Sequence, residues 1–111
     1  MERQIIVQGE ATSFAFFHLS FPVVGERRLH VGKHDVLEFT IGRRNRKPVI
    51  IKRYPGEIER EINDTFVVTL TASETAKLPC LLYRMQLTLD ILGHGEERYL
   101  IVDKELEVAA K

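Results

Sequence analysis

Hydrophobic and polar positions alternate along much of this chain, and the clearest alternation runs through residues 83–91. Tyr83, Met85, Leu87, Leu89 and Ile91 are apolar or aromatic, and every position between them is polar. Successive side chains of an extended chain point to opposite faces, so these five residues share one face. The pattern predicts a strand that is buried on one face and in contact with water on the other.

A shorter alternation and a helix signal precede this strand. In Phe66–Leu70 the first, third and fifth residues are apolar. Thr71 and Glu74 then have the spacing of a capping box, in which each side chain accepts from the backbone N–H of the other residue. Pro79 disfavours helical angles in the residue before it. We therefore expect one short helical turn near residues 72–78.

Further alternating or apolar runs bring the total to about seven strands. The other runs cover residues 3–8, 13–21, 35–41, 49–53 and 98–108, while residues 57–62 fit a strand or an irregular edge. Turn signals separate the runs about every 8–12 residues, which is typical of a sandwich or an open barrel. We predict a single all-β domain over residues 1–111, an antiparallel two-sheet sandwich of the immunoglobulin-like kind. No stretch is long enough for the crossover helices of a parallel α/β fold.

The aromatic run at residues 13–21 is compatible with two registers. The inward set is either Phe14, Phe16 and His18 or Phe17, Leu19 and Phe21. A slip of one residue exchanges the two faces of a strand. We favour Phe14 and Phe16 inward, followed by a bulge or twist that partly buries Phe17 and Leu19.

The composition indicates a chain without a dominant charge. Of 111 residues 44% are hydrophobic, and 16 Lys and Arg balance 16 Asp and Glu. Such a chain has enough apolar surface for one core, but it has no overall field that steers it to nucleic acid or to an anionic membrane. A net charge near zero also permits close self-association.

The single cysteine and the first residues of the chain indicate the cellular compartment of the protein. Cys80 has no partner for an internal disulfide, and we expect it to be a small buried hydrophobe. Met1–Gln4 lack the basic and then apolar pattern of a secretory signal. No apolar run approaches the roughly 20 residues that span a bilayer. We therefore expect the protein to lie in a reducing cytosol, or in a particle assembled there, and not in a membrane.

The only concentrated charge lies in a predicted loop between Gly42 and Pro48. The candidate interaction residues are Arg43, Arg44, Arg46 and Lys47, with Asn45 at the centre of the loop. A basic loop can contact an acidic protein surface, an anionic ligand or nucleic acid. The tract is short and has no interleaved aromatic residues, which argues against nucleic acid.

No pattern of catalytic residues is evident. His30 and His34 have a spacing that suits zinc on a helix, but their flanks are strand-like, so we interpret them as solvated loop histidines and expect no metal or cofactor. Glu57, Glu59 and Glu61 form either an acidic face or a solvated edge. The chain contains no Gly-rich phosphate loop, Gly-x-Ser-x-Gly or Cys-x-x-Cys motif. We expect that the protein is not an enzyme.

The order of these signals resembles a known family. A Gly9-Glu10 break is followed by an aromatic strand, then by Leu37–Ile41 with its hairpin partner, and later by Phe66–Pro79 and the strand that begins at Tyr83. This order is similar to the immunoglobulin-like sandwich domains of tailed-phage and prophage structural proteins, in particular the N-terminal domain of upper baseplate proteins. The chain differs from that family in having no Gly just before Tyr83.

This resemblance implies a position and a role for the protein. In that family the short capped turn carries the chain from one sheet to the other. The implied function is a non-enzymatic structural or adaptor protein of the tail or baseplate, located in a virion that is assembled in the bacterial host cytoplasm. Its implied partners are other virion subunits and further copies of itself. The alternative is a small β-domain that binds an anionic ligand or nucleic acid through residues 43–47.

Overall fold

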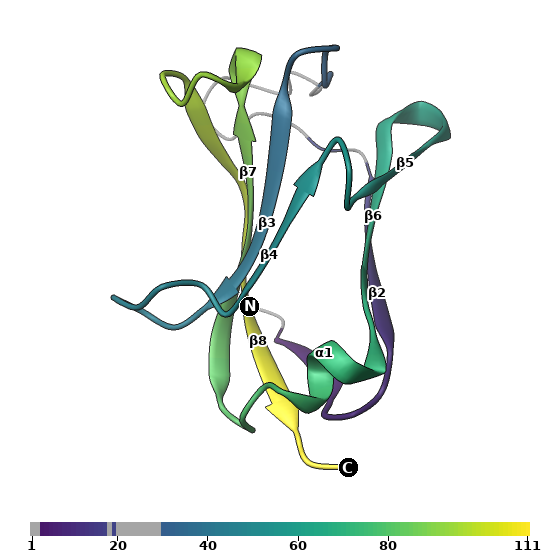
Figure 1. Cartoon of the computed structure of the whole chain (residues 1–111), viewed down its shortest axis with the longest axis vertical. Helices are drawn as coiled ribbons and strands as arrows, with labels where there is room; N and C mark the ends of the chain where they lie inside the picture. The colour runs from purple at the N-terminus through teal and green to yellow at the C-terminus, as the bar shows by residue number, and fades with distance from the viewer. Residues whose placement is uncertain (1–2, 18, 20–29) are drawn as a thin grey trace.

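The computed structural model describes residues 3–17, 19 and 30–111, and it is built mostly of strands (Figure 1). Within these ranges the strands are β1 (Gln4–Val7), β2 (Thr12–Phe16), β3 (Val36–Gly42), β4 (Ile50–Tyr54), β5 (Glu59–Glu61), β6 (Thr65–Leu70), β7 (Leu82–Asp90) and β8 (Arg98–Ala109). The helical segments are α1 (Ala72–Ala76) and two 3₁₀ turns, η1 (Ile62–Asp64) and η2 (Ile91–Gly93).

The strands of the described ranges form two facing sheets, which confirms the predicted all-β sandwich. One sheet has five strands in the order β1-β8-β7-β3-β4, and the other has three in the order β2-β6-β5. All pairs are antiparallel except β1 and β8, which run parallel, so the larger sheet is mixed. The described ranges contain one strand more than the roughly seven predicted, because residues 59–61, which fit a strand or an irregular edge, pair with β6.

The core lies between the two sheets, and it is filled by the alternating residues that the sequence indicates. Leu87 of β7 lies opposite Phe39 on the adjacent strand β3, and both side chains are fully buried. Phe66 is fully buried on the smaller sheet. Ile91, the last residue of the predicted strand, is only half-buried because η2 begins there.

The favoured register of β2 is confirmed in part. Phe14 and Phe16 are buried, and their rings lie 5.6 Å and 6.1 Å from the ring of Phe39. Leu19 is half-buried against the core. The expected partial burial of Phe17 is wrong, because this side chain is 61% exposed just after β2 ends. The predicted end of the run at residues 20–21 lies outside the described residues, as does most of the connection that follows it.

The predicted capping box is present at the start of α1. The Glu74 N–H donates to the Thr71 hydroxyl at 3.1 Å, and the Thr71 N–H donates to the Glu74 carboxylate at 2.9 Å. The Thr75 hydroxyl is buried and donates to the Glu10 carbonyl at 2.9 Å. Because α1 lies between β6 of the smaller sheet and β7 of the larger one, this turn carries the chain from one sheet to the other.

One prediction about a single residue is wrong. Cys80 is exposed rather than buried, because it lies in the open connection between α1 and β7. Ile62, which fits the alternation of residues 57–62, is also exposed. The chain leaves β5 there, and Asn63 and Asp64 both have positive φ angles, so the side chain of Ile62 turns away from the core.

Candidate interaction surface

The basic residues lie in the loop that joins β3 to β4, and this basic loop (residues 43–47) projects from the body of the molecule (Figure 1). The Arg46 N–H donates to the Arg43 carbonyl at 3.1 Å, which closes a tight turn. Asn45 has a φ of 60°, a left-handed conformation that Asn tolerates better than most residues. A Cβ at Gly42 would lie 3.1 Å from the Pro48 Cα, so the base of the loop is closely packed.

The arginines of the basic loop differ from the other described arginines in their partners. Arg3, Arg53, Arg60, Arg84 and Arg98 each form an ion pair with a carboxylate of the chain. Within the described residues, Arg43, Arg44 and Arg46 are the arginines without an ion pair. All three are exposed. Unpaired guanidinium groups are therefore concentrated in one loop.

An open cleft lies between the basic loop and the outer face of the larger sheet. Its volume is about 500 Å³, and its lining includes the three loop arginines, Arg84 and Gln86. Asp103 also lines the cleft, where it accepts from Arg84 Nε at 3.0 Å. Among the described residues that line the cleft, none has an aromatic ring on which a base could stack.

A second hollow, here called the apolar pocket, lies on another side of the loop. It has a volume of about 180 Å³ and is walled by Val49, Pro79, Leu81 and Tyr83, with Arg43, Arg46 and Lys47 at its rim. The Tyr83 hydroxyl donates to the Pro79 carbonyl at 2.8 Å, so this hydroxyl already has a hydrogen-bond partner within the chain. Burial raises the pKa of the Tyr83 phenol.

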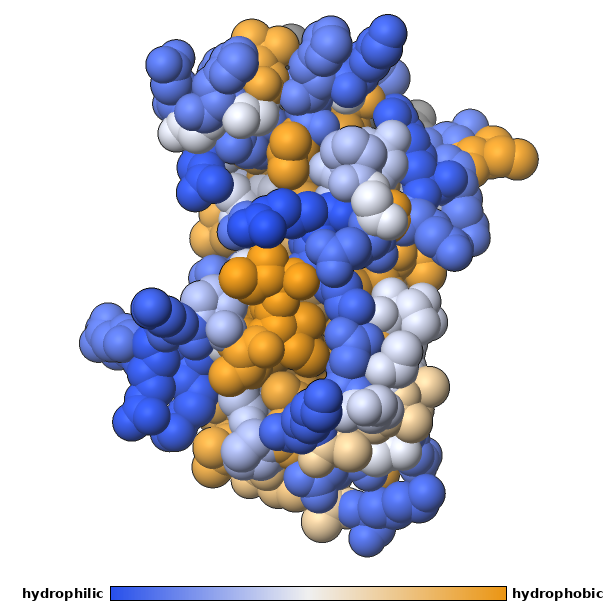
Figure 2. Space-filling model, viewed as in Figure 1, coloured by the Kyte–Doolittle hydropathy of each residue, from blue (hydrophilic) through white to orange (hydrophobic). Residues whose placement is uncertain are grey.

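Apolar surface continues from Val49 along β4. A groove of about 300 Å³ is lined by residues from β4, from α1 and from the connection that follows α1. Figure 2 shows an apolar patch at the centre of this face, beside the hydrophilic basic loop. Lys52 spans the groove and pairs with Glu74 at 2.8 Å. This pair holds the pKa of Glu74 below its usual range.

The backbone edge of β4 is only partly open, although β4 pairs in the described ranges only with β3. The Arg53 carbonyl accepts from the N–H groups of Glu57 and Ile58, and the Arg53 N–H donates to the Glu57 carboxylate. The end of β4 at Arg53 therefore already has hydrogen-bond partners, so an added strand could not pair there.

The remaining candidates from the sequence do not gather into a site. His30 and His34 are exposed, and His30 Nδ1 lies 3.1 Å from Asp64 Oδ2. Within the described ranges, no three His, Cys, Asp or Glu side chains lie close enough together to hold a metal ion. Glu57, Glu59 and Glu61 are all exposed at the β5 side of the molecule.

Comparison with known proteins adds no relative. No family model matches the chain, and no curated protein matches it. None of the helices in the described residues is long and apolar enough to cross a membrane.

Sequence reasoning identified the basic loop but not the apolar pocket beside it. The pocket combines Val49 from one hairpin with Pro79, Leu81 and Tyr83 from a distant segment. Val49 and Leu81 are exposed and directly precede β4 and β7, and only the pairing order of the sheet brings them together.

Proposed function

We propose that this chain is a non-enzymatic structural or adaptor subunit of a phage or prophage particle, of the tail or baseplate type. It acts through protein–protein assembly. The observation that carries the proposal is the cluster of unpaired arginines beside an exposed apolar pocket. Like charges in one short loop repel one another, and an acidic partner surface removes this repulsion. The phage setting rests on the resemblance in sequence.

The chemistry of the loop fits a protein partner. A guanidinium group can pair with a carboxylate through two parallel hydrogen bonds, which lysine cannot do. A buried apolar centre with a charged rim is also the usual anatomy of a protein interface. The partners in this proposal are other virion subunits and further copies of the chain, and the site of action is the virion, assembled in the host cytoplasm.

The test uses the organism that encodes the chain. Particles released after phage induction are purified on a density gradient, and the protein is sought in the particle fraction by mass spectrometry. Wild type should co-purify with particles, and Arg43→Glu/Arg44→Glu/Arg46→Glu should be depleted from them. The control Lys33→Glu/Lys104→Glu/Lys111→Glu makes the same charge change at exposed positions outside the loop. If the wild-type chain is absent from the particles, the proposal is wrong.

The cleft next to the loop favours one alternative, the binding of an anionic ligand or nucleic acid. Four arginines line it, counting Arg84. Asp103 in the same wall and the lack of a stacking ring weaken this alternative. A low-salt titration with inorganic phosphate and with a short single-stranded DNA separates the two. Saturable shifts of the amide resonances of residues 43–47 would support ligand binding, and unchanged resonances would remove it.

A further inference from the structure

The turn from β5 into η1 presents an exposed apolar side chain after two acidic residues. Ile62 is 85% exposed, the largest exposed fraction of any large hydrophobic side chain in the described residues. Glu59 and Glu61, which precede it, are exposed as well. We call these three residues the acidic knob. Exposed apolar side chains of this size are ordinary when single, but this one has acidic neighbours that match the basic rim of the apolar pocket.

The acidic knob is held by an internal network. Arg60 points inward and donates from Nη2 to the Val31 carbonyl at 2.9 Å and from Nη1 to the Tyr54 hydroxyl at 3.3 Å. Its guanidinium also pairs with Asp64, on the far side of Ile62 in the chain. The turn around Ile62 is therefore anchored at both ends, so presenting the side chain to a partner costs little ordering entropy.

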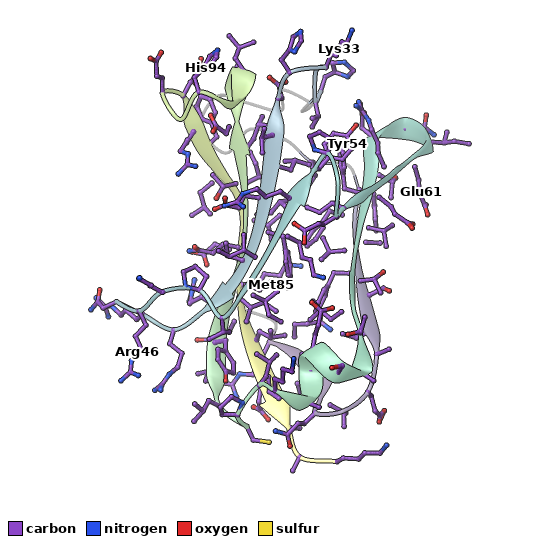
Figure 3. The ribbon with its side chains drawn as sticks, in the orientation of Figure 1. Lys33, Arg46, Tyr54, Glu61, Met85 and His94 are labelled. Atoms are coloured by element: carbon purple, nitrogen blue, oxygen red, sulfur yellow. The ribbon has the colours of Figure 1, made fainter. Side chains whose placement is uncertain are left out.

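The acidic knob and the apolar pocket lie on opposite sides of the molecule. Figure 3 shows Arg46 at the tip of the basic loop on one side and Glu61 on the other. Figure 2 shows a hydrophilic projection on the first side and an apolar projection on the second. One molecule therefore cannot bring its own knob to its own pocket.

We propose that the acidic knob of one copy inserts into the apolar pocket of a second copy, so that the chain associates head to tail. Ile62 fills the pocket between Val49, Leu81 and Tyr83, while the knob carboxylates pair with Arg43, Arg46 and Lys47 at the rim. This inference rests on the proposed function and names the partner of the basic loop. Two different surfaces meet in such a contact, so it extends to a ring or to an open filament. The balanced net charge of the chain is consistent with this, because each copy supplies both signs.

The test uses two variants of the full chain that each lose one surface. The knob variant is Glu59→Gln/Glu61→Gln/Ile62→Ser, and the pocket variant is Arg43→Glu/Arg46→Glu/Lys47→Glu. Sedimentation velocity follows wild type, each variant and their equimolar mixture over a concentration series that reaches millimolar, at low and at high salt. The control Glu10→Gln/Glu96→Gln removes two exposed carboxylates outside the knob.

The behaviour of the mixture distinguishes this head-to-tail contact from a symmetric one. Wild type should gain mass with concentration, more at low salt than at high salt because salt screens exposed pairs. Each variant alone should associate at least tenfold more weakly. Their mixture should form a 1:1 dimer and grow no further, because the intact knob of the pocket variant fits only the intact pocket of the knob variant. The control should behave as wild type.

Three results would overturn the inference. They are a wild type that stays monomeric at every concentration, variants that associate as well as wild type, and a mixture no heavier than its components. Thermal melts of both variants check that they are folded, and Ile62→Ser alone serves as a milder knob variant. The particle experiment decides the proposed function separately, since a subunit can join a particle through other partners without associating with itself.

Discussion

Two segments of the chain, the basic loop that precedes β4 and the β5–η1 segment that follows it, use arginine in opposite ways. In the β5–η1 segment, Arg60 donates to Asp64, Tyr54 and Val31, and its guanidinium carbon lies 5.8 Å and 5.5 Å from the ring centres of Tyr54 and Phe66. In the basic loop, the described contacts give Arg43, Arg44 and Arg46 no carboxylate partner. Arg60 therefore stabilises the fold, whereas the arginines of the basic loop remain available to another molecule.

This difference separates stability from interaction. Arg60 makes several hydrogen bonds, so it cannot be removed without leaving its partners unsatisfied. An exposed and unpaired arginine leaves nothing unsatisfied in its own chain. Substitutions in the two segments should therefore divide cleanly between loss of stability and loss of association.

The largest effect on stability is expected in the core strand β7. Leu87→Ala should lower the free energy of unfolding by about 2–5 kcal/mol, the usual range for a fully buried leucine. Thr88→Ala, on the outer face of the same strand, should change it by less than about 0.5 kcal/mol. Urea denaturation measures both. Equal losses would show that the faces of β7 are assigned wrongly.

Removal of Arg60 should have the next largest effect. Arg60→Ala breaks its hydrogen bonds and its two ring contacts, and should cost about 1–3 kcal/mol. Arg60→Lys keeps the charge but loses the fork geometry, so it should recover only part of the loss. The matched change Arg44→Ala in the basic loop should be neutral in the same urea experiment. If Arg60→Ala is also neutral, the contrast between the two segments is wrong.

Acid should remove part of the Arg60 network. The hydrogen bond from Arg60 lowers the pKa of Asp64, so the folded state favours the carboxylate. This contribution is complete above the ordinary aspartate pKa of about 3.9 and is lost as the pH falls through the lowered value. The stability gap between wild type and Asp64→Asn should therefore close below about pH 4. Urea midpoints across the pH range measure this gap, and a gap that persists at the lowest pH would contradict the expectation.

The capping box provides a smaller effect. Thr71→Ala should cost about 1 kcal/mol through loss of the cap. Glu74 has a second role as the partner of Lys52, so Glu74→Ala should still destabilise a chain that lacks Thr71. A double-mutant cycle should show coupling between Thr71 and Glu74, because the two side chains serve one box. Fully additive losses would show that the box contributes nothing.

The parts of the fold that the sequence predicted are those set by local rules. Burial of one face imposes a period of two, so the inward residues of β3, β6 and β7 are readable, and the box at Thr71 is a four-residue signal. No local sequence pattern indicates which distant strands pair, so the parallel pairing of β1 with β8 was missed. The exposure of Cys80 was missed as well, because this residue lies in the irregular connection between α1 and β7.

The candidate interaction surface could likewise be predicted from the sequence only in part. The basic loop was visible as a run of charges between Gly42 and Pro48. That its arginines are unpaired, while Arg60 and Arg84 are paired, depends on carboxylates brought close by the fold. The apolar pocket requires residues that are about thirty positions apart in sequence to meet at one sheet end. No local pattern carries this information.

The smallest effect on stability is expected in the basic loop, and it is the sharpest test of the comparison. Arg43→Glu/Arg44→Glu/Arg46→Glu removes no ion pair within the described residues, so the thermal midpoint of the monomer should stay almost unchanged. The neutral variant Arg43→Gln/Arg44→Gln/Arg46→Gln should stabilise slightly at low salt, because three like charges in one loop no longer repel. Calorimetry at low and high salt measures both, with Arg53→Gln, which loses its pair with Glu38, as the paired control. A marked loss of stability in the neutral variant would mean that the loop arginines serve the fold, and the reason to assign them to a partner would disappear.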